Sequence, residues 1–313
     1  MNRFAFAIVL FSAGTAFLCA QQEKPVAKPV QPPASCIWKV AGKNGNTIFL
    51  AGSVHLLRDQ DYPIPPAYDA VYDKSLRLVF EIDMRKMEDP SELLKIREKG
   101  LYPAGDSLKK HLSKKTWRLL EKYIRKNNLQ QMQMERMRPG FAYLTISSLE
   151  TMKLGAKPEL GLEGVFFQKS KKDAKPSGGL ETMEFQLNLF NELSDEEQDE
   201  MLREGLTSID ETAESIDEMI GAWKNGNAKE LDRLMTEQFE ENAKIRELLL
   251  TNRNKDWIPH IEEAMEGKQN VMFLVGAGHL VGKDSVVDLL RKKGYTVEQV
   301  AHDSTAKAEA AAE

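Results

Sequence analysis

The sequence predicts an α/β fold, with a central mixed β-sheet built from both chain ends, flanking helices and a large helical middle region. The first observation is a pair of matching apolar stretches, TIFLAGSVHLL at residues 47–57 and VMFLVGAGHLV at 271–281, which share five of eleven positions. The second is the long segment between them, where apolar residues recur at helical spacing. Both stretches have the pattern of a buried strand, so the two chain ends are expected to meet in one sheet.

The first expected elements form a β-hairpin. CIWKVAG (36–42) and TIFLAGS (47–53) are apolar runs, and the Asn-Gly of KNGN between them is typical of a tight turn. PPAYDAVYDKS (65–75) predicts a helix with proline near its first turn, and LRLVFEIDM (76–84) predicts a strand.

The middle of the chain predicts helices. SKKTWRLLEKYIRKNN (113–128) has a serine N-cap ahead of apolar residues at helical spacing, and PGFAYLTISSLETMKLG (139–155) is a more apolar helix. Residues 194–227 predict one long amphipathic helix or a helix pair, and residues 231–268 continue the helices. SGGLET (177–182) indicates a short strand or a turn.

The C-terminal part returns to the sheet. NVMFLVGAGHL (270–280) predicts a buried strand, GKDSVVDLLRKKG (282–294) a helix and YTVEQV (295–300) a closing strand. A single α/β domain is therefore expected over residues 36–302, followed by a disordered tail at 303–313.

The N-terminus is typical of a secretory signal peptide. Arg3 precedes an apolar run that ends at Leu18, and Cys19-Ala20 follows. This pattern predicts a signal peptide over residues 1–20 and a periplasmic or secreted protein. Leu18 argues against a lipid anchor on Cys19, because lipidation normally requires a small residue there, so contact with the membrane is expected only through the export signal.

A proline-rich linker is expected next, over residues 21–35, QQEKPVAKPVQPPAS. Cleavage at the end of the signal peptide would leave Cys36 as the only cysteine, so no internal disulfide is expected. With a net charge of -5, nothing in the composition indicates a general nucleic-acid-binding surface, and no nucleic-acid partner is expected.

Each of the two matching stretches ends in Gly-x-x-His, at Gly52 and His55 and again at Gly276 and His279. Glycine lets the backbone turn sharply, and the histidine then lies just beyond the carboxyl end of its strand. Ligands of α/β sheets bind at that edge, so two imidazoles are expected there together. The alternative is that both are ordinary strand-end histidines that hydrogen-bond the backbone.

A carboxylate is expected at the same edge. Glu81 lies near the end of the apolar run RLVFEIDM, and carboxylates are rarely buried unless they are paired or metal-bound. Two histidines and one glutamate can hold a divalent metal and leave a position for water. Glu81 could instead orient a histidine that activates water directly, or form an exposed salt bridge.

The segment IWKVAG…FEID, residues 37–83, resembles the opening of the TraB/PrgY/GumN family, which is related to the TIKI metalloproteases. That family has a Gly-x-x-His, a glutamate on the following strand and a second Gly-x-x-His near the C-terminus, which match His55, Glu81 and His279 here. Further matches are GLEGVFFQKS around Glu163, GGLETMEFQ around Glu181 and NRNKDW around Arg253. The resemblance covers about residues 36 to 300.

The resemblance implies an exported metal-dependent, peptidase-like hydrolase, with His55, Glu81 and His279 as catalytic and metal-binding residues. The implied metal is Mn²⁺ or Co²⁺, ahead of Zn²⁺. The resemblance also implies kinship with the erythromycin-esterase fold, where paired histidines act without metal on an ester or amide bond. A non-catalytic module that binds or sequesters peptides is the third alternative.

Three further residues are candidates for binding a peptide or small-molecule substrate: Arg253, Glu163 and Glu181. Arg253 could neutralise a substrate carboxylate. Structural ion pairs are the alternative for all three residues.

Overall fold

The computed structural model describes residues 34–239 and 242–302. The expected signal peptide, most of the expected linker and the tail at 303–313 lie outside the described residues. The last two residues of the expected linker, Ala34 and Ser35, are described, and they belong to strand β1 (Ala34–Ala41). Within the described ranges, no helix is both long and apolar enough to cross a membrane.

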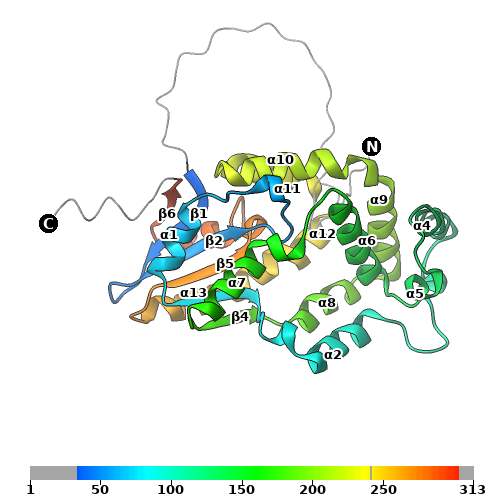
Figure 1. Cartoon of the computed structure of the whole chain (residues 1–313), viewed down its shortest axis with the longest axis horizontal. Coiled ribbons are helices and arrows are strands. Elements are labelled where there is room, and N and C mark those ends of the chain that lie inside the picture. The colour runs from blue at the N-terminus through cyan, green and yellow to red at the C-terminus, as the bar shows by residue number, and fades with distance from the viewer. Residues whose placement is uncertain (1–33, 240–241, 303–313) are drawn as a thin grey trace, which may run out of the picture.

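A six-stranded mixed sheet forms the centre of the fold, in the order β4-β3-β5-β2-β1-β6 (Figure 1). Its other strands are β2 (Thr47–Ser53), β3 (Arg77–Ile82), β4 (Ser177–Glu181), β5 (Val271–Gly276) and β6 (Val297–Ala301). β2, β5, β3 and β4 are parallel to one another, whereas β1 runs antiparallel to β2 and β6. The predicted α/β fold, with a mixed sheet from both chain ends, is confirmed, and the described residues in the middle of the chain add β4.

The predicted hairpin is confirmed by the first two strands, β1 and β2. β1 and β2 pair antiparallel, with Ala41 opposite Thr47 at the last register position. Gly45 in the connection has a φ of 82°, a left-handed conformation that favours glycine. The Asn-Gly pair therefore supplies the backbone freedom that this turn requires.

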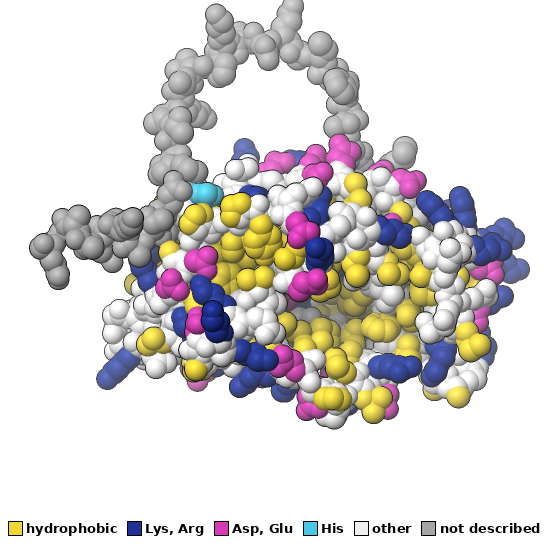
Figure 2. Space-filling view, viewed as in Figure 1, with side chains coloured by type: hydrophobic (Ala, Val, Ile, Leu, Met, Phe, Trp, Pro, Cys, Tyr) yellow, Lys and Arg dark blue, Asp and Glu magenta, His cyan; other side chains and the backbone are white. Residues whose placement is uncertain are grey.

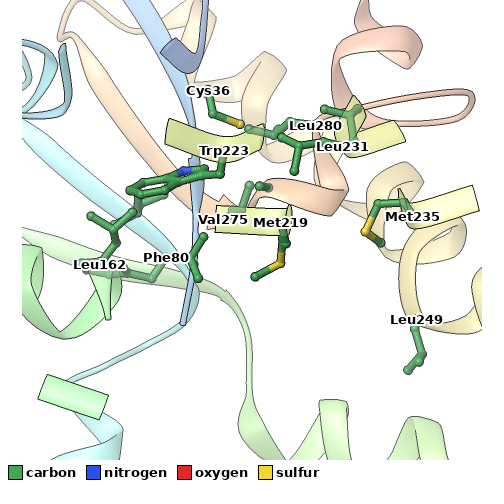
Figure 3. Close-up of a cluster of buried hydrophobic side chains, with 14 of the residues drawn as sticks. Cys36, Phe80, Leu162, Met219, Trp223, Leu231, Met235, Leu249, Val275 and Leu280 are labelled. Carbon is green, nitrogen blue, oxygen red and sulfur yellow. The ribbon is translucent and has the colours of Figure 1, made fainter. Parts of the chain in front are cut away.

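Helices cover both faces of the sheet. Phe80 of β3 packs edge-on against Phe167 of α7 (Leu162–Lys172), with ring centroids 6.3 Å apart. Its neighbour Val79 points to the other face, where α13 (Asn252–Glu266) packs and a cavity lies beside the C-terminal part of that helix. Figure 3 shows part of the core, including Phe80, Leu162 and Trp223.

A helical region lies beside the sheet, as predicted (Figure 1). The helices not yet given are α1 (Ala67–Lys74), α2 (Pro90–Gly100), α3 (Leu108–His111), α4 (Lys114–Lys126), α5 (Gln131–Glu135), α6 (Pro139–Lys153), α8 (Met183–Asn191), α9 (Asp195–Thr207), α10 (Thr212–Lys224), α11 (Ala228–Gln238), α12 (Ala243–Arg246) and α14 (Val286–Lys292). A π-helical turn (Glu247–Thr251) leads directly into α13.

Side-chain caps set several helix starts. The predicted Ser113 cap of α4 is confirmed, since its hydroxyl accepts the backbone N–H of Thr116 at 3.2 Å. Ser194 and Glu197 form a capping box at the start of α9. The segment 194–227 is a helix pair, because a 3₁₀ turn (Ile209–Glu211) separates α9 from α10.

Candidate active site

Four neighbouring strands bring acidic and imidazole side chains to one edge of the sheet. His55 follows β2, Glu81 is near the end of β3, Glu181 is the last residue of β4, and His279 ends the 3₁₀ turn after β5. These strands are parallel and adjacent, so their carboxyl ends share one edge. Figure 2 shows a hollow on the viewed face, in the region between α7 and α8, with hydrophobic side chains around it.

Arg253 of α13 contacts side chains from three of these elements, namely Glu81, Glu181 and His279. Its Nη2 lies 2.6 Å from Oε2 of Glu81 and 2.8 Å from Oε2 of Glu181. Its Nε donates to Glu181 at 3.0 Å, and its Nη1 donates to the Leu249 carbonyl at 2.9 Å and to Nε2 of His279 at 3.2 Å. Because all five guanidinium N–H groups have acceptors within the protein, Arg253 has none left for a substrate.

The two carboxylates in this network are fully engaged. Oε1 of Glu81 accepts the backbone N–H of Gly276 at 2.7 Å, and its other oxygen, Oε2, accepts from Arg253. Glu181 also accepts from the indole of Trp257 at 2.7 Å and the amide of Gln186 at 3.0 Å. Burial alone would raise the pKa of Glu81, but Arg253 and the nearby histidines hold that pKa well below its usual range.

His279 is buried and neutral. The side-chain amide nitrogen of Asn254 donates to the Asp284 carbonyl at 3.0 Å, so the amide oxygen of Asn254 faces His279. Nδ1 of His279 therefore donates to this oxygen, Oδ1, at 2.6 Å. Its Nε2 therefore accepts the proton offered by Arg253. Burial, aided by the charge of Arg253, lowers the pKa of His279 to about 3, although Glu81 acts in the opposite direction.

His55 has the opposite environment. Its Nδ1 lies 2.7 Å from Oε1 of Glu163, a residue in the first turn of α7 that also accepts from the Ser53 hydroxyl. Glu163 raises the pKa of His55 to about 9 against the effect of burial. The His55 side chain is 39% exposed, and among the described residues Glu163 is its hydrogen-bonding partner, so Nε2 is the nitrogen left to face a substrate.

Gly276 is the point where these groups meet. A Cβ on this residue would lie 3.0 Å from Oε1 of Glu81, 3.6 Å from Cδ2 of His279 and 3.7 Å from Nε2 of His55. The two imidazoles and the carboxylate thus surround one small space, which the absence of a side chain leaves open.

The backbone ahead of His55 is held by two residues that the sequence patterns did not single out. Tyr68 of α1 donates its hydroxyl to the carbonyl oxygen of Gly52. The indole of Trp223 donates to the same oxygen at 2.8 Å and to the Tyr68 hydroxyl at 2.7 Å. Tyr68 was visible only as one aromatic of a predicted helix, and Trp223 had no motif around it.

Asn254 and Trp257 were also missed as site residues. They lie one and four positions after Arg253 on α13, so the helical spacing in NRNKDW places all three on adjoining faces. The centroid of the Trp257 ring lies 4.4 Å from that of His279. The spacing within this segment is the signal that could have identified them.

The predicted metal ligands lie close together, but they do not present a free set of donors. Glu81 and both nitrogens of His279 are occupied by Arg253, Gly276 and Asn254. Across the part of the chain that the structure describes, no group of three or more His, Cys, Asp or Glu side chains is placed to hold a metal ion. In this arrangement the residues do not fit a divalent metal, and their role as ligands stays a prediction.

The residues predicted to bind substrate are engaged inside the protein as well. Arg253 pairs with Glu181, and Glu163 pairs with His55. The geometry therefore favours roles in orienting neighbouring groups, while direct substrate contact stays a prediction.

Curated relatives of the chain include animal and bacterial proteins. Metalloprotease TIKI2 of Danio rerio is 23% identical over 80% of this chain, and metalloprotease TIKI1 of the same species is 22% identical over 84%. The chain spans only 58% and 63% of the length of these two proteins. YbaP of Escherichia coli, a protein described as uncharacterized, is 23% identical over 79% of this chain and 89% of its own length.

No solved structure matches the chain. The TraB/PrgY/gumN family matches it over residues 36–299, which includes both Gly-x-x-His motifs, Glu81 and Arg253. The resemblance predicted from the motifs is therefore confirmed, and the chain belongs to the TraB/PrgY/gumN family.

Proposed function

We propose that this protein is a hydrolase of peptide, amide or ester bonds, with His55 as the general base. The observation that carries the proposal is the partly exposed His55 ring, which Glu163 holds through Nδ1, with Nε2 directed to the small space beside Gly276. A carboxylate on one nitrogen fixes the tautomer that leaves the other nitrogen free to accept a proton. The mode of action is then proton removal from an attacking water.

The neighbouring residues have distinct roles in this proposal. Nε2 of His55 takes the proton from water as the water attacks a carbonyl carbon, and Glu163 stabilises the imidazolium that forms. The imidazolium then returns this proton to the leaving amine or alcohol as the C–N or C–O bond breaks, which leaves the carboxylic acid and a neutral His55. Gly276 leaves room for the reacting group beside Nε2. Arg253, Glu81 and His279 form the rigid, buried wall of this space, because each of them is fixed by hydrogen bonds within the protein.

A metal-dependent peptidase is the second candidate, favoured by the relatives that carry the name metalloprotease. For His55, Glu81 and His279 to act as ligands, Arg253 would have to leave both Glu81 and His279. The two candidates therefore differ in whether the Arg253 network stays closed in the active protein.

The test is hydrolysis by the purified protein of a fluorogenic peptide library and a panel of aryl esters. We expect His55→Ala to lower the rate by about 100-fold or more, the usual effect of losing a general base. His260→Ala is the matched control, because His260 is an exposed histidine of α13 outside the site. Equal activity in folded His55→Ala and wild-type protein would refute the role of His55.

Metal dependence is measured in the same assay. We expect activity to survive prolonged dialysis against a chelator. Loss of activity on dialysis, with recovery on adding Mn²⁺ or Co²⁺, would instead establish the second candidate. A folded protein that binds peptides without hydrolysing any of them would leave the third alternative, a binding module.

We also propose that the mature protein is exported and begins near Gln21, on the basis of the signal-peptide pattern in residues 1–20. The intact mass of the protein purified from its native source measures this. A chain that retains Met1, or that carries a lipid on Cys19, would contradict the proposal.

A further inference from the structure

A second cavity lies at the same edge of the sheet as the histidines. It measures about 250 Å³ and is bordered by the ends of β3 and β4 and by α2 and α8. Ile82 and Thr182, which line it, directly follow Glu81 and Glu181. The larger cavity, of about 360 Å³, includes Arg77 and Val271 at the opposite, amino ends of the strands and is therefore remote from the site.

The distance from His55 to the smaller cavity follows from the sheet. β3 is separated from β2 by β5 alone, and neighbouring strands lie about 4.8 Å apart. The end of β3, where the cavity begins, is therefore roughly 10 Å from the end of β2. An extended peptide advances about 3.3 Å per residue, so about three residues cover this distance.

The cavity has a mixed lining, in which apolar side chains alternate with Thr182 and with charged side chains of both signs. Four of its lining side chains are apolar: Ile82, Met87, Ile96 and Met183. Two of them are methionines, which adapt their shape to different occupants.

The charged residues around the cavity are largely paired with one another. Lys95 bonds Glu92 at 2.6 Å, Arg85 holds Asp83 at 2.6 Å, and Lys99 lies 3.2 Å from Glu184. Pairing leaves little net charge to attract an ionic ligand, so the four apolar side chains favour an apolar group over an ionic one.

We propose that this cavity is a specificity subsite that binds an apolar side chain of a peptide substrate, about three residues from the bond that is cleaved. The proposal rests on the hydrolase proposed above and names its substrate class: an extended peptide with a leucine- or methionine-sized side chain at that position. Short esters and amides do not reach the cavity and are insensitive to it.

The first experiment compares peptides extended by three residues to either side of the reacting bond, with Leu or Ser at the last added position. We expect the wild type to prefer Leu by about ten-fold or more in kcat/KM in one of the two series, in line with the discrimination that an apolar pocket provides. Equal rates for Leu and Ser in both series overturn the proposal.

Variants then locate the preference. We expect Ile96→Glu to abolish the Leu preference and leave the hydrolysis of a short ester unchanged, because the new carboxylate enters the cavity wall. Leu94→Glu is the matched control: Leu94 is on the same helix and 56% exposed, but does not line the cavity. A preference that persists in Ile96→Glu, or that is lost equally in Leu94→Glu, overturns the assignment.

Binding of the same peptides, labelled and followed by fluorescence anisotropy, separates the two proposals. If no peptide is hydrolysed but the Leu peptide binds about ten-fold more tightly than the Ser peptide, and Ile96→Glu removes the difference, the subsite stands and the hydrolase proposal fails. If hydrolysis occurs without discrimination at this position, the hydrolase stands and the subsite fails. Met183→Glu, on the facing helix, repeats the test if Ile96→Glu does not fold.

Discussion

Replacing Arg253 by Met is expected to destabilise the protein strongly. The substitution keeps an unbranched apolar stem but removes the charge that pairs with Glu81 and Glu181 at 2.6 and 2.8 Å. All three side chains are less than 10% exposed. Water therefore cannot replace the guanidinium without opening the site.

The size of the effect follows from the contacts that remain. Breaking a buried ion pair by removing one partner costs about 3–5 kcal/mol, because the other charge is left uncompensated. Here two carboxylates lose their partner, but the Gly276 N–H still holds Glu81, and the Trp257 indole still holds Glu181. These donors offset part of the loss, so we expect a decrease of about 4 kcal/mol in the free energy of unfolding.

The measurement is urea denaturation followed by tryptophan fluorescence, for which Trp257, 5.1 Å from the guanidinium, is a local probe. Arg233→Met is the matched control: Arg233 pairs with Glu230 and Glu237 on the surface of α11, where ion pairs contribute about 0–1 kcal/mol. If Arg253→Met lowers the free energy of unfolding by less than about 1 kcal/mol, the network is not the rigid wall that we describe.

The effect should also depend on pH. In the wild type the pKa of Glu81 lies below its usual value of 4.5, so its ionised form stabilises the fold above that pH, and the stabilisation is lost as the pH falls through the lowered pKa. Without Arg253, burial raises the pKa of Glu81, and the residue takes up a proton at higher pH. The difference between wild type and variant should therefore be largest near neutral pH and shrink on acidification.

Three further substitutions test the site. In a pH–rate profile of the wild type, kcat/KM should rise toward pH about 9, as His55 loses its proton. In Glu163→Gln the midpoint of this rise should move toward the ordinary histidine pKa of about 6.5. Gly276→Ala should lower kcat/KM at least about ten-fold with little change in thermal melting, because the added Cβ lies 3.7 Å from Nε2 of His55 and 3.0 Å from a carboxylate oxygen. Tyr68→Phe should lower the free energy of unfolding by about 1–2 kcal/mol in urea, since its buried hydroxyl bonds the Gly52 carbonyl.

Each of these substitutions has a contrary result. An unshifted pH profile in Glu163→Gln would show that another group is the base. Full activity in Gly276→Ala would show that the substrate does not approach that glycine. Unchanged stability in Tyr68→Phe would show that Trp223 alone suffices to hold the Gly52 carbonyl.

The strands at the chain ends were predictable because their burial is continuous. β2 and β5 lie in the middle of the sheet between helices, so nearly every residue in each is apolar and buried. β4 was ambiguous for the opposite reason: SGGLE has two glycines and little side-chain burial. A Cβ on Gly179 would collide with the backbone at Ile82 and Asp83. Glycine is therefore needed for β4 to pack beside β3, and no local sequence pattern reveals this contact.

The break between α9 and α10 could not be located from sequence. The turn at Ile209–Glu211 contains neither Gly nor Pro, and apolar residues continue at helical spacing on both sides. The two helices separate because α9 packs against α4 and α6, whereas α10 packs against α11 and β1. α4, α6 and β1 are distant from this turn in the chain, so tertiary packing decided what local propensity left open.

The meeting of strand ends at the site could be predicted, but the contacts around each residue could not. Parallel strands bring His55, Glu81 and His279 to one edge whatever surrounds them. Arg253 reaches the edge from a helix more than 170 positions after Glu81, and nothing in the sequence specifies which carboxylate it meets. The prediction of a metal site rested on the donor types, their shared edge and the family resemblance. None of these places Arg253, and the placement of this cation determines whether the donors are free.

The two Gly-x-x-His motifs look equivalent in sequence, yet the fold gives them different chemistry. Gly52 admits the close approach of Cys36 and Ala277, whereas Gly276 leaves space between the two imidazoles. His279, sealed among Asn254, Arg253 and Trp257, has its pKa lowered to about 3, whereas His55 beside Glu163 has its pKa raised to about 9. Two like groups whose environments move their pKa values apart usually have different roles. His279 is engaged by Asn254 and Arg253 through both ring nitrogens, so in the proposed hydrolase proton transfer to and from a substrate is assigned to His55.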